Sequence, residues 1–300
     1  MSGDAARRAQ GWLGYESTDI PVSWSLRDVL TYALAVGADP ARDAAYLTEA
    51  AGPRLLPTFA TVAAGSWVPH LHRTIWADEP AGVLTGLAYR LHGPVGISGS
   101  AVTRVRVTGY EVKPSAVLVW LTTNTLGEHG RLMTGRHCVL FRGGGERQAC
   151  GEVGSLPEPG PRAADAVPRT AAVRVDSRAV ALYRLLLPLA AGQQGPDLLH
   201  ADAAASAAAG LGAPSLHGVA VVGHVGVAIA RMLGAEMPRV RGFGARFRRP
   251  VHPGDTLAVS AWPLVPAGSA GPGWELRAAG ETGEEVLDGA WIEMLEEEDA

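Results

Sequence analysis

The chain has 300 residues, enough for one large domain or two ordinary ones. Its 47% hydrophobic and 19% charged residues indicate a globular protein, and a net charge of −4 gives no electrostatic basis for binding nucleic acid. Only Cys138 and Cys150 occur, so a disulfide framework is excluded; no cysteine or histidine cluster has metal-site spacing, and we expect no metal. Residues 1–21 lack the apolar core of a signal peptide and no run approaches twenty apolar residues, so we expect a cytoplasmic protein without a membrane span.

The first half is predicted to begin with a helix and to continue with strands. Residues 23–38 carry a helical pattern in which Ser25 is a candidate N-cap and Asp28 follows three residues later. Leu26, Val29, Leu30, Ala33 and Leu34 share one face of this predicted helix. Three runs rich in strand-forming residues, 101–109, 115–125 and 131–143, are joined by short turns. They predict an antiparallel meander.

A segment rich in Gly, Pro and Ala divides the chain near its middle. Residues 143–170 show no hydrophobic periodicity, which is typical of a linker. We therefore expect an N-terminal domain over residues 1–142 and a C-terminal domain over residues 171–300.

The second half predicts one long helix followed by a sheet. Residues 217–234 are apolar and rich in small residues, and each glycine costs an isolated helix about 1 kcal/mol relative to alanine. Such a helix persists only when other elements enclose it. Four predicted strands follow within residues 239–295, separated by Gly-rich turns. A central helix wrapped by an antiparallel sheet is a hot-dog unit.

The first half has the same succession of strands, with residues 56–65 in the place of the central helix. Two such units in tandem predict an α+β protein with a double hot-dog fold, each unit having a central helix wrapped by an antiparallel sheet.

The segment from Gly192 to Gly218 carries the densest motif. Its sequence GQQGPDLLHADAAASAAAGLGAPSLHG resembles the pattern GDxNPLHxDxxxAxxxGFxxPIxHG of the MaoC-like hydratases and dehydratases, also called hydratase 2. The matching positions are His200, Asp202, Ala205, Ala209, Gly210, Pro214, His217 and Gly218. Residues 247–257, FRRPVHPGDTL, are similar to a second motif of the family, and residues 56–62 and 91–93 resemble pieces of its N-terminal unit. The resemblance spans about residues 20 to 295.

The resemblance implies stereospecific addition of water to an acyl thioester, or its removal, without a cofactor. In this family an aspartate and the histidine five residues later form an acid/base pair, and a backbone N–H at the start of the central helix polarises the thioester carbonyl. His200 and Gly218 take the last two of these roles by their positions. The helix start suits an oxyanion because it offers unpaired N–H groups and a positive dipole end.

The sequence departs from the family pattern at the catalytic aspartate. Gly195 stands five residues before His200, and Asp197 occupies the place of the motif's asparagine. The stretch before His200 is also about seven residues longer than the pattern expects, and Gln193 and Gln194 lie in it. Three alternatives follow: Asp197 supplies the carboxylate from a shifted loop, His200 works alone, or the hydration chemistry has been lost.

Other residues near the motifs are candidates for binding the substrate. Asp202 and His217 are candidates by position; the alternatives are that Asp202 caps a helix and that His217 shapes the turn into the central helix. Arg246, Arg248 and Arg249 are candidates for the phosphates of coenzyme A or of a carrier-protein arm, because the guanidinium fork suits phosphate. The alternative is a solvated strand face.

These patterns together predict a MaoC-like hydro-lyase that acts on an enoyl or 3-hydroxyacyl thioester of coenzyme A or of acyl carrier protein. The altered motif favours polyketide or other specialised metabolism. The first half would lack a catalytic motif and widen the pocket, and a homodimer is compatible with the fold. The first alternative is a homologue that binds acyl groups or a partner subunit without catalysis. The second is a cyclase of the oxa-Michael type.

Overall fold

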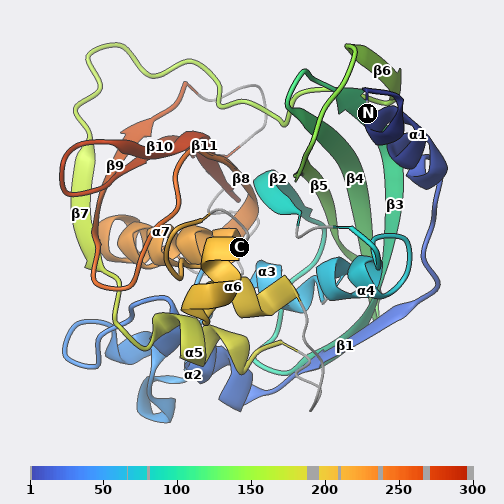
Figure 1. Ribbon diagram of the computed structural model, residues 1–300. Coiled ribbons are helices and arrows are strands. Elements are labelled where there is room, and N and C mark those ends of the chain that lie inside the picture. Colours follow the sequence, from blue (N-terminus) through green and yellow to red (C-terminus); the bar gives the residue numbers. More distant parts are fainter. Residues whose placement is uncertain are drawn as a thin grey trace.

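The structure, a computed structural model, describes residues 2–65, 67–79, 82–187, 196–208, 211–235, 239–265 and 271–295 (Figure 1). The helices are α1 (Ser2–Trp12), α2 (Leu26–Ala35), η1 (Ala44–Tyr46), η2 (Glu49–Ala51), α3 (Ala60–Ala63), α4 (Trp67–Arg73), α5 (Ala179–Arg184), η3 (Pro196–His200), α6 (Ala203–Ala208) and α7 (Gly218–Leu233). The strands are β1 (Ile20–Trp24), β2 (Val83–Leu91), β3 (Gly99–Val112), β4 (Ala116–Gly127), β5 (Gly130–Arg142), β6 (Gln148–Gly151), β7 (Arg169–Arg174), β8 (Val240–Phe247), β9 (Thr256–Pro263), β10 (Gly273–Ala279) and β11 (Glu285–Met294).

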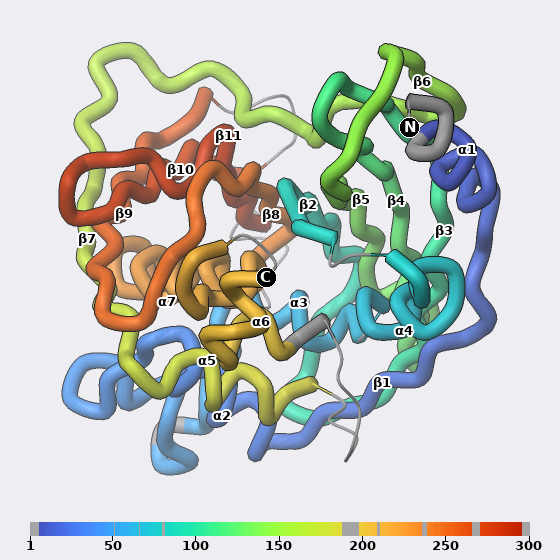
Figure 2. The backbone as a smooth tube through the Cα atoms, in the orientation of Figure 1, coloured from blue at the N-terminus to red at the C-terminus, as the bar shows by residue number. Residues whose placement is uncertain are grey.

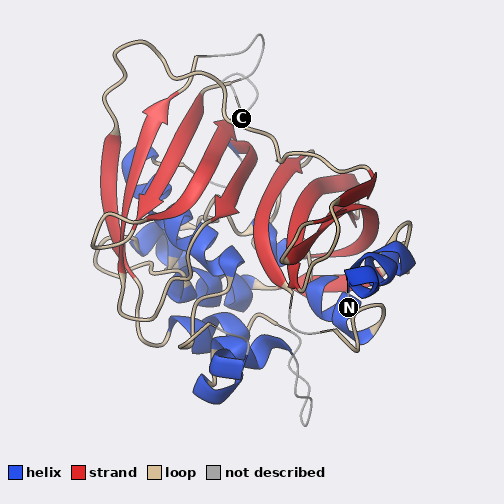
Figure 3. Ribbon diagram, turned by 45° about the horizontal axis from the view of Figure 1, so that its top comes forward, coloured by secondary structure: helices blue, strands red, loops and turns tan. Residues whose placement is uncertain are grey.

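One sheet runs through both halves of the chain. Its strand order is β1-β3-β4-β5-β2-β8-β11-β10-β9-β7, with β6 paired to β3. The two halves of the sheet repeat one plan. β1 of the first half and β7 of the second form the two outer edges, and β2 and β8 pair with each other at the centre. All the ladders between these strands are antiparallel. Figure 3 shows the two halves of the sheet arching over the helices, which lie on the inner side.

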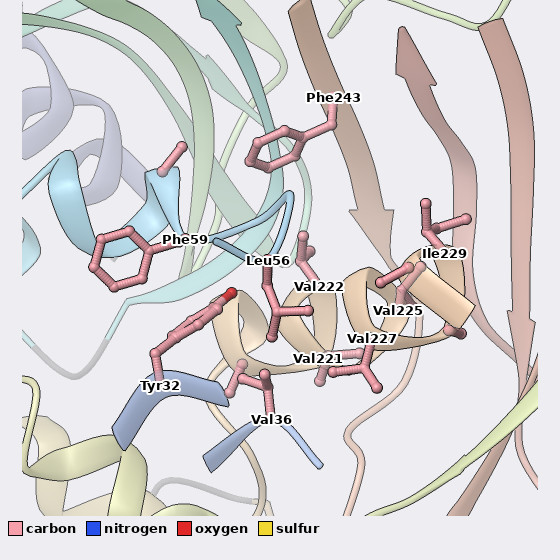
Figure 4. Packing of buried hydrophobic residues seen from close by; sticks show 14 of the residues in the cluster. Tyr32, Val36, Leu56, Phe59, Val221, Val222, Val225, Val227, Ile229 and Phe243 are labelled. Carbon is pink, nitrogen blue, oxygen red and sulfur yellow. The ribbon is translucent and has the colours of Figure 1, made fainter. Parts of the chain in front are cut away.

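The second half is a hot-dog unit as the sequence predicts. α7 is enclosed by the sheet, and all its residues from Ala220 to Ala230 are buried. Figure 4 shows its valines packing against Tyr32, Val36 and Leu56 of the first half. The glycines of α7 are therefore required by packing, because a Cβ at Gly223 would lie 2.9 Å from the Tyr32 hydroxyl. Enclosure makes up for their weak helix propensity.

The first half replaces the long helix with two short ones. α3 has only four residues and α4 seven, and Gly65, with φ of 77°, separates them. Pro57 and Pro69 also oppose one continuous helix, because proline removes a backbone donor and clashes with the preceding turn. α1 and α4 then cover the inner face of β3, β4 and β5 through a second apolar cluster. The central helix predicted for this unit is thus present only as fragments.

The predicted linker is more ordered than its composition indicates. β6 lies inside it and pairs with β3, and the buried Leu156 anchors it to the outer face of the sheet. Figure 2 shows the segment between β6 and β7 crossing the top of both halves. The division at 1–142 and 171–300 stays a prediction, because the sheet and the main core continue across it.

Most elements that the sequence predicts are confirmed. α2 begins after Ser25, and Ser25 and Asp28 form the expected capping box. β3, β4 and β5 form the expected meander, and β8 to β11 follow α7. One detail is wrong: Leu34 is 41% exposed, whereas Tyr32 of the same helix is buried. Among the described residues no helix is long and apolar enough to cross a membrane.

Candidate active site

The loop before α7 is held in place by the second sequence motif. The Leu216 N–H donates to the Val251 carbonyl at 2.8 Å, and His252 Nδ1 donates to the Pro214 carbonyl at 2.9 Å. The Asp255 carboxylate in turn accepts from the His252 N–H at 2.8 Å. The residues PVHPGD therefore hold the segment that carries His217 and the start of α7.

His200 lies at the end of η3 and its imidazole is oriented by this same loop. Its Nδ1 lies 2.9 Å from the carbonyl oxygen of Ser215, and the residue is half-buried. A carbonyl can only accept, so Nδ1 must carry the proton of this hydrogen bond. In the neutral ring Nε2 then carries the lone pair, which is the form that a general base requires.

The ring of His200 stacks on that of His217. The two ring centroids are 3.7 Å apart with an interplanar angle of 31°, and Tyr183 of α5 lies on the His217 ring with centroids 5.2 Å apart. His217 is also the N-cap residue of α7, with extended backbone angles. The stack thus sets the imidazole of His200 beside the first turn of the central helix.

The start of α7 offers amide hydrogens to a ligand. Ala220 and Val221 both donate to the His217 carbonyl, whereas no acceptor is found among the described residues for the N–H groups of Gly218 and Val219. The buried helix behind them adds a positive dipole end. A Cβ at Gly218 would lie 3.1 Å from the Phe247 ring, so glycine here allows the helix start to approach Phe247 closely.

The candidate catalytic carboxylate, Asp197, is only partly described by the structure. Asp197 belongs to η3, three residues before His200, but its side chain lies outside the described part of the structure, as does all of Gly195. Gln193, Gln194, Ala209 and Gly210 also lie outside the described residues. The catalytic role of Asp197 therefore stays a prediction.

Asp202 has the geometry of a helix cap. Its Oδ1 accepts a hydrogen bond from the Ala205 N–H at 2.7 Å, at the start of α6, and the residue is exposed. This contact is the one expected if Asp202 caps a helix. No contact among the described residues supports a role in binding the substrate, and that role stays a prediction. By fixing α6 directly after η3, Asp202 supports the chain that carries His200.

The three arginines do not converge on this site. Arg246 pairs with Glu158 at 3.0 Å and with Asp288 at 3.8 Å, and Arg248 also pairs with Asp288. Side chains alternate along a strand, so Arg246 and Arg248 point to the face opposite Phe247. Arg249 follows β8 and is exposed. The alternative of a solvated strand face fits these contacts, and we do not propose a phosphate-binding role for the three arginines.

Two residues that hold the stacked histidines were not singled out as site residues from the sequence. Ser215 orients His200 through its backbone carbonyl, which no sequence pattern reports, and Tyr183 packs on the ring of His217. His224, further along α7, is fully buried, and burial lowers its pKa to about 4. Its Nδ1 donates to the Ala220 carbonyl at 2.8 Å, so it is a packed residue of the helix. In the described part of the chain no three His, Cys, Asp or Glu residues form a group that could hold a metal.

Comparisons with known proteins agree with this architecture. The family model described as a MaoC like domain matches residues 165–264. The chain is 32% identical to the enoyl-CoA hydratase ChsH3 of Mycobacterium tuberculosis, over 83% of this chain and 87% of that protein. It is 31% identical to the 3-hydroxyacyl-thioester dehydratase Y of the same organism, over 91% of this chain and 93% of that protein.

Among solved structures, a MaoC-like dehydratase from Phytophthora capsici aligns with a TM-score of 0.74 and 15% identity, over 96% of this chain and 98% of that one. At this identity the likeness shows the fold alone, and together with the sheet order it establishes a double hot-dog.

Proposed function

The chain belongs to the MaoC-like family of hydratases and dehydratases, and we propose that it adds water to an enoyl thioester or removes water from a 3-hydroxyacyl thioester. The observation that carries this proposal is the imidazole of His200, held by the Ser215 carbonyl and stacked beside the first turn of α7. In this proposal His200 is the base and the first amides of α7 are the oxyanion donors, and their nearness supports it because proton transfer next to a thioester carbonyl requires both at one place.

In the hydration direction, Nε2 of His200 accepts a proton from water while the water oxygen adds to Cβ of the enoyl group. The electron pair of the double bond moves toward the thioester oxygen, where the Gly218 N–H donates a hydrogen bond to the developing negative charge. A proton then reaches Cα, and we assign its delivery to Asp197, since Gly195 stands where the family has its aspartate. Dehydration is the reverse of these steps.

The substrate is proposed as a thioester of coenzyme A or of acyl carrier protein. The names of two relatives support the thioester, because one is an enoyl-CoA hydratase and the other a 3-hydroxyacyl-thioester dehydratase. We also propose that the first half accommodates the acyl chain, because its central helix is reduced to the four residues of α3 whereas α7 has sixteen.

The test is the hydration of crotonyl-CoA and of longer enoyl-CoA thioesters, followed by the loss of enoyl absorbance. We expect His200→Ala to abolish turnover, whereas His129→Ala, in the exposed turn between β4 and β5, leaves it unchanged. Asp197→Asn should lower turnover strongly without unfolding the protein. If the wild type hydrates no enoyl thioester of any chain length, or if His200→Ala retains full activity, the proposal fails.

A further inference from the structure

A hollow of about 530 Å³ lies on the outer face of the sheet, away from α7. Its walls come from β2, β3, β4 and β5 of the first half, from Glu16 before β1, from β11 of the second half, and from the crossing segment at Pro157 and Glu158. α7 packs on the inner face of the same sheet, as Figure 3 shows. The hollow is therefore separate from the site at His200. Its volume lies in the range of small-molecule sites, about 300 to 1,000 Å³.

The strand register builds the floor of this hollow in two parallel rows. Residues that pair across neighbouring strands point to the same face. The first row crosses β3, β4, β5 and β2 through Arg106, Thr122, Arg136 and Ala88. The second row crosses the same strands through Arg104, Asn124, Thr134 and Arg90.

Small residues in the middle of the sheet make room for the Trp291 indole at one side of the floor. Ala88 is followed across the sheet by Gly244, and a Cβ at Gly244 would lie 2.7 Å from Nε1 of Trp291. The Trp291 indole thus lies against bare backbone and forms a side wall. Its Nε1 donates to the Pro157 carbonyl at 3.0 Å, which fixes the crossing segment as the rim.

In the part of the chain that the structure describes, two of the arginines that line the hollow form ion pairs with carboxylates and two do not. Arg90 pairs with Glu293 at 3.2 Å, and Arg104 pairs with Asp19 at 2.5 Å. Arg106 and Arg136, on either side of Thr122, have no carboxylate partner among the residues that the structure describes.

Two buried polar atoms in the same hollow also lack partners. Nε of Arg136, a donor, and Oδ1 of Asn124, an acceptor, are shielded from solvent and make no hydrogen bond within the described part of the chain. Because both atoms are closed to solvent, they lie beneath the surface of the hollow, and its ligand contacts are left to the side-chain groups that line it.

We propose that this hollow binds a phosphate monoester that also carries hydroxyl or amino donors. Arg106 and Arg136 would hold the phosphate from two sides of the Thr122 hydroxyl, because the planar guanidinium fork matches phosphate geometry. Thr134 and the exposed part of Asn124 line the hollow beside the phosphate position and suit the hydroxyl or amino groups of the ligand, and the Trp291 indole packs against its ring. A sugar phosphate and a nucleoside monophosphate share this chemistry.

The experiment is calorimetric titration of the full chain at low salt with ribose 5-phosphate, AMP and adenosine. We expect saturable binding of a phosphorylated probe and none of adenosine. Tighter binding of AMP than of ribose 5-phosphate identifies a nucleotide site, and equal binding identifies a sugar phosphate site.

Variants separate this site from the catalytic one. The double variant Arg106→Met/Arg136→Met should weaken binding at least tenfold, whereas Arg277→Met, which removes an exposed arginine paired with Glu285 on β10, should not. His200→Ala should bind as the wild type does, whether or not the proposed hydration activity exists. Melting temperatures close to that of the wild type establish that the variants fold. The inference is overturned if neither phosphorylated probe binds saturably, if the double variant binds normally, or if His200→Ala abolishes binding.

Discussion

Substituting Gly223 by alanine should destabilise the protein although alanine is the better helix former. In an open helix the change would contribute about 1 kcal/mol of stability. Here the new Cβ would meet Val36 and would lie 2.9 Å from the Tyr32 hydroxyl. Neither neighbour can yield, because Val36 is fully buried and the Tyr32 hydroxyl donates to Thr58 at 2.8 Å.

Overpacking of this kind costs about 1–3 kcal/mol, so we expect a net loss of stability and a melting temperature lower by a few degrees. The matched control is Gly11→Ala in α1, where a Cβ would meet nothing within 4 Å and stability should stay equal or rise. Thermal unfolding followed by circular dichroism measures both variants. If Gly223→Ala melts at or above the wild-type temperature, the close packing of α7 against α2 is refuted.

Two further predictions concern buried charge. Burial lowers the pKa of His137 to about 3 and that of His224 to about 4, so each histidine stabilises the fold above pH 6.5 in its neutral form and loses that contribution as the pH falls toward its folded pKa. At pH 5 each histidine should lower the unfolding free energy by about 2 kcal/mol. Melting curves between pH 7.5 and 5 should show this loss of stability, and the loss should be smaller in His137→Phe. A melting temperature that does not change with pH would contradict the prediction. Arg231→Met should cost about 3–5 kcal/mol because it leaves the buried Asp43 carboxylate without its 2.7 Å partner. Adding Asp43→Asn should restore part of the stability in urea unfolding, and an additive loss in the double variant would contradict the pairing.

The second unit could be predicted almost completely from the sequence, and the first only in part. α7 and the strands after it have strong apolar patterns and clear turns, so their types and order were evident. β2 was missed because VLTGLAYRL is an apolar run without alternation. Its outer side carries Gly86 and Ala88, which lie against Leu156 of the crossing segment or line the hollow. The face of α2 was misplaced at Leu34, because that helix packs against α5 through tertiary contacts that its own periodicity does not record.

The candidate site shows the same division. His200, His217 and Gly218 could be chosen from a motif, since their spacing is local. The orientation of the His200 ring depends on the Ser215 carbonyl, and the position of that carbonyl depends on contacts with Val251 and His252 about forty residues away. The ion pairs of Arg246 and Arg248 depend likewise on β11 and the crossing segment, which is why their sequence pattern was open to two interpretations.

The unequal helices of the two units explain why a double hot-dog of this kind has one candidate catalytic site. In the second unit, the sixteen-residue helix α7 begins at Gly218, whose N–H has no acceptor among the described residues, and an imidazole is stacked beside this start. In the first unit, α3 has four residues, and the N–H groups of Thr61 and Val62 donate to the carbonyls of Thr58 and Phe59 just before it. A helix that short gathers only a small dipole, and its start has few amides left for an oxyanion. The shortening of the central helix in the first unit therefore accounts for the absence of a second oxyanion site of this kind among the described residues.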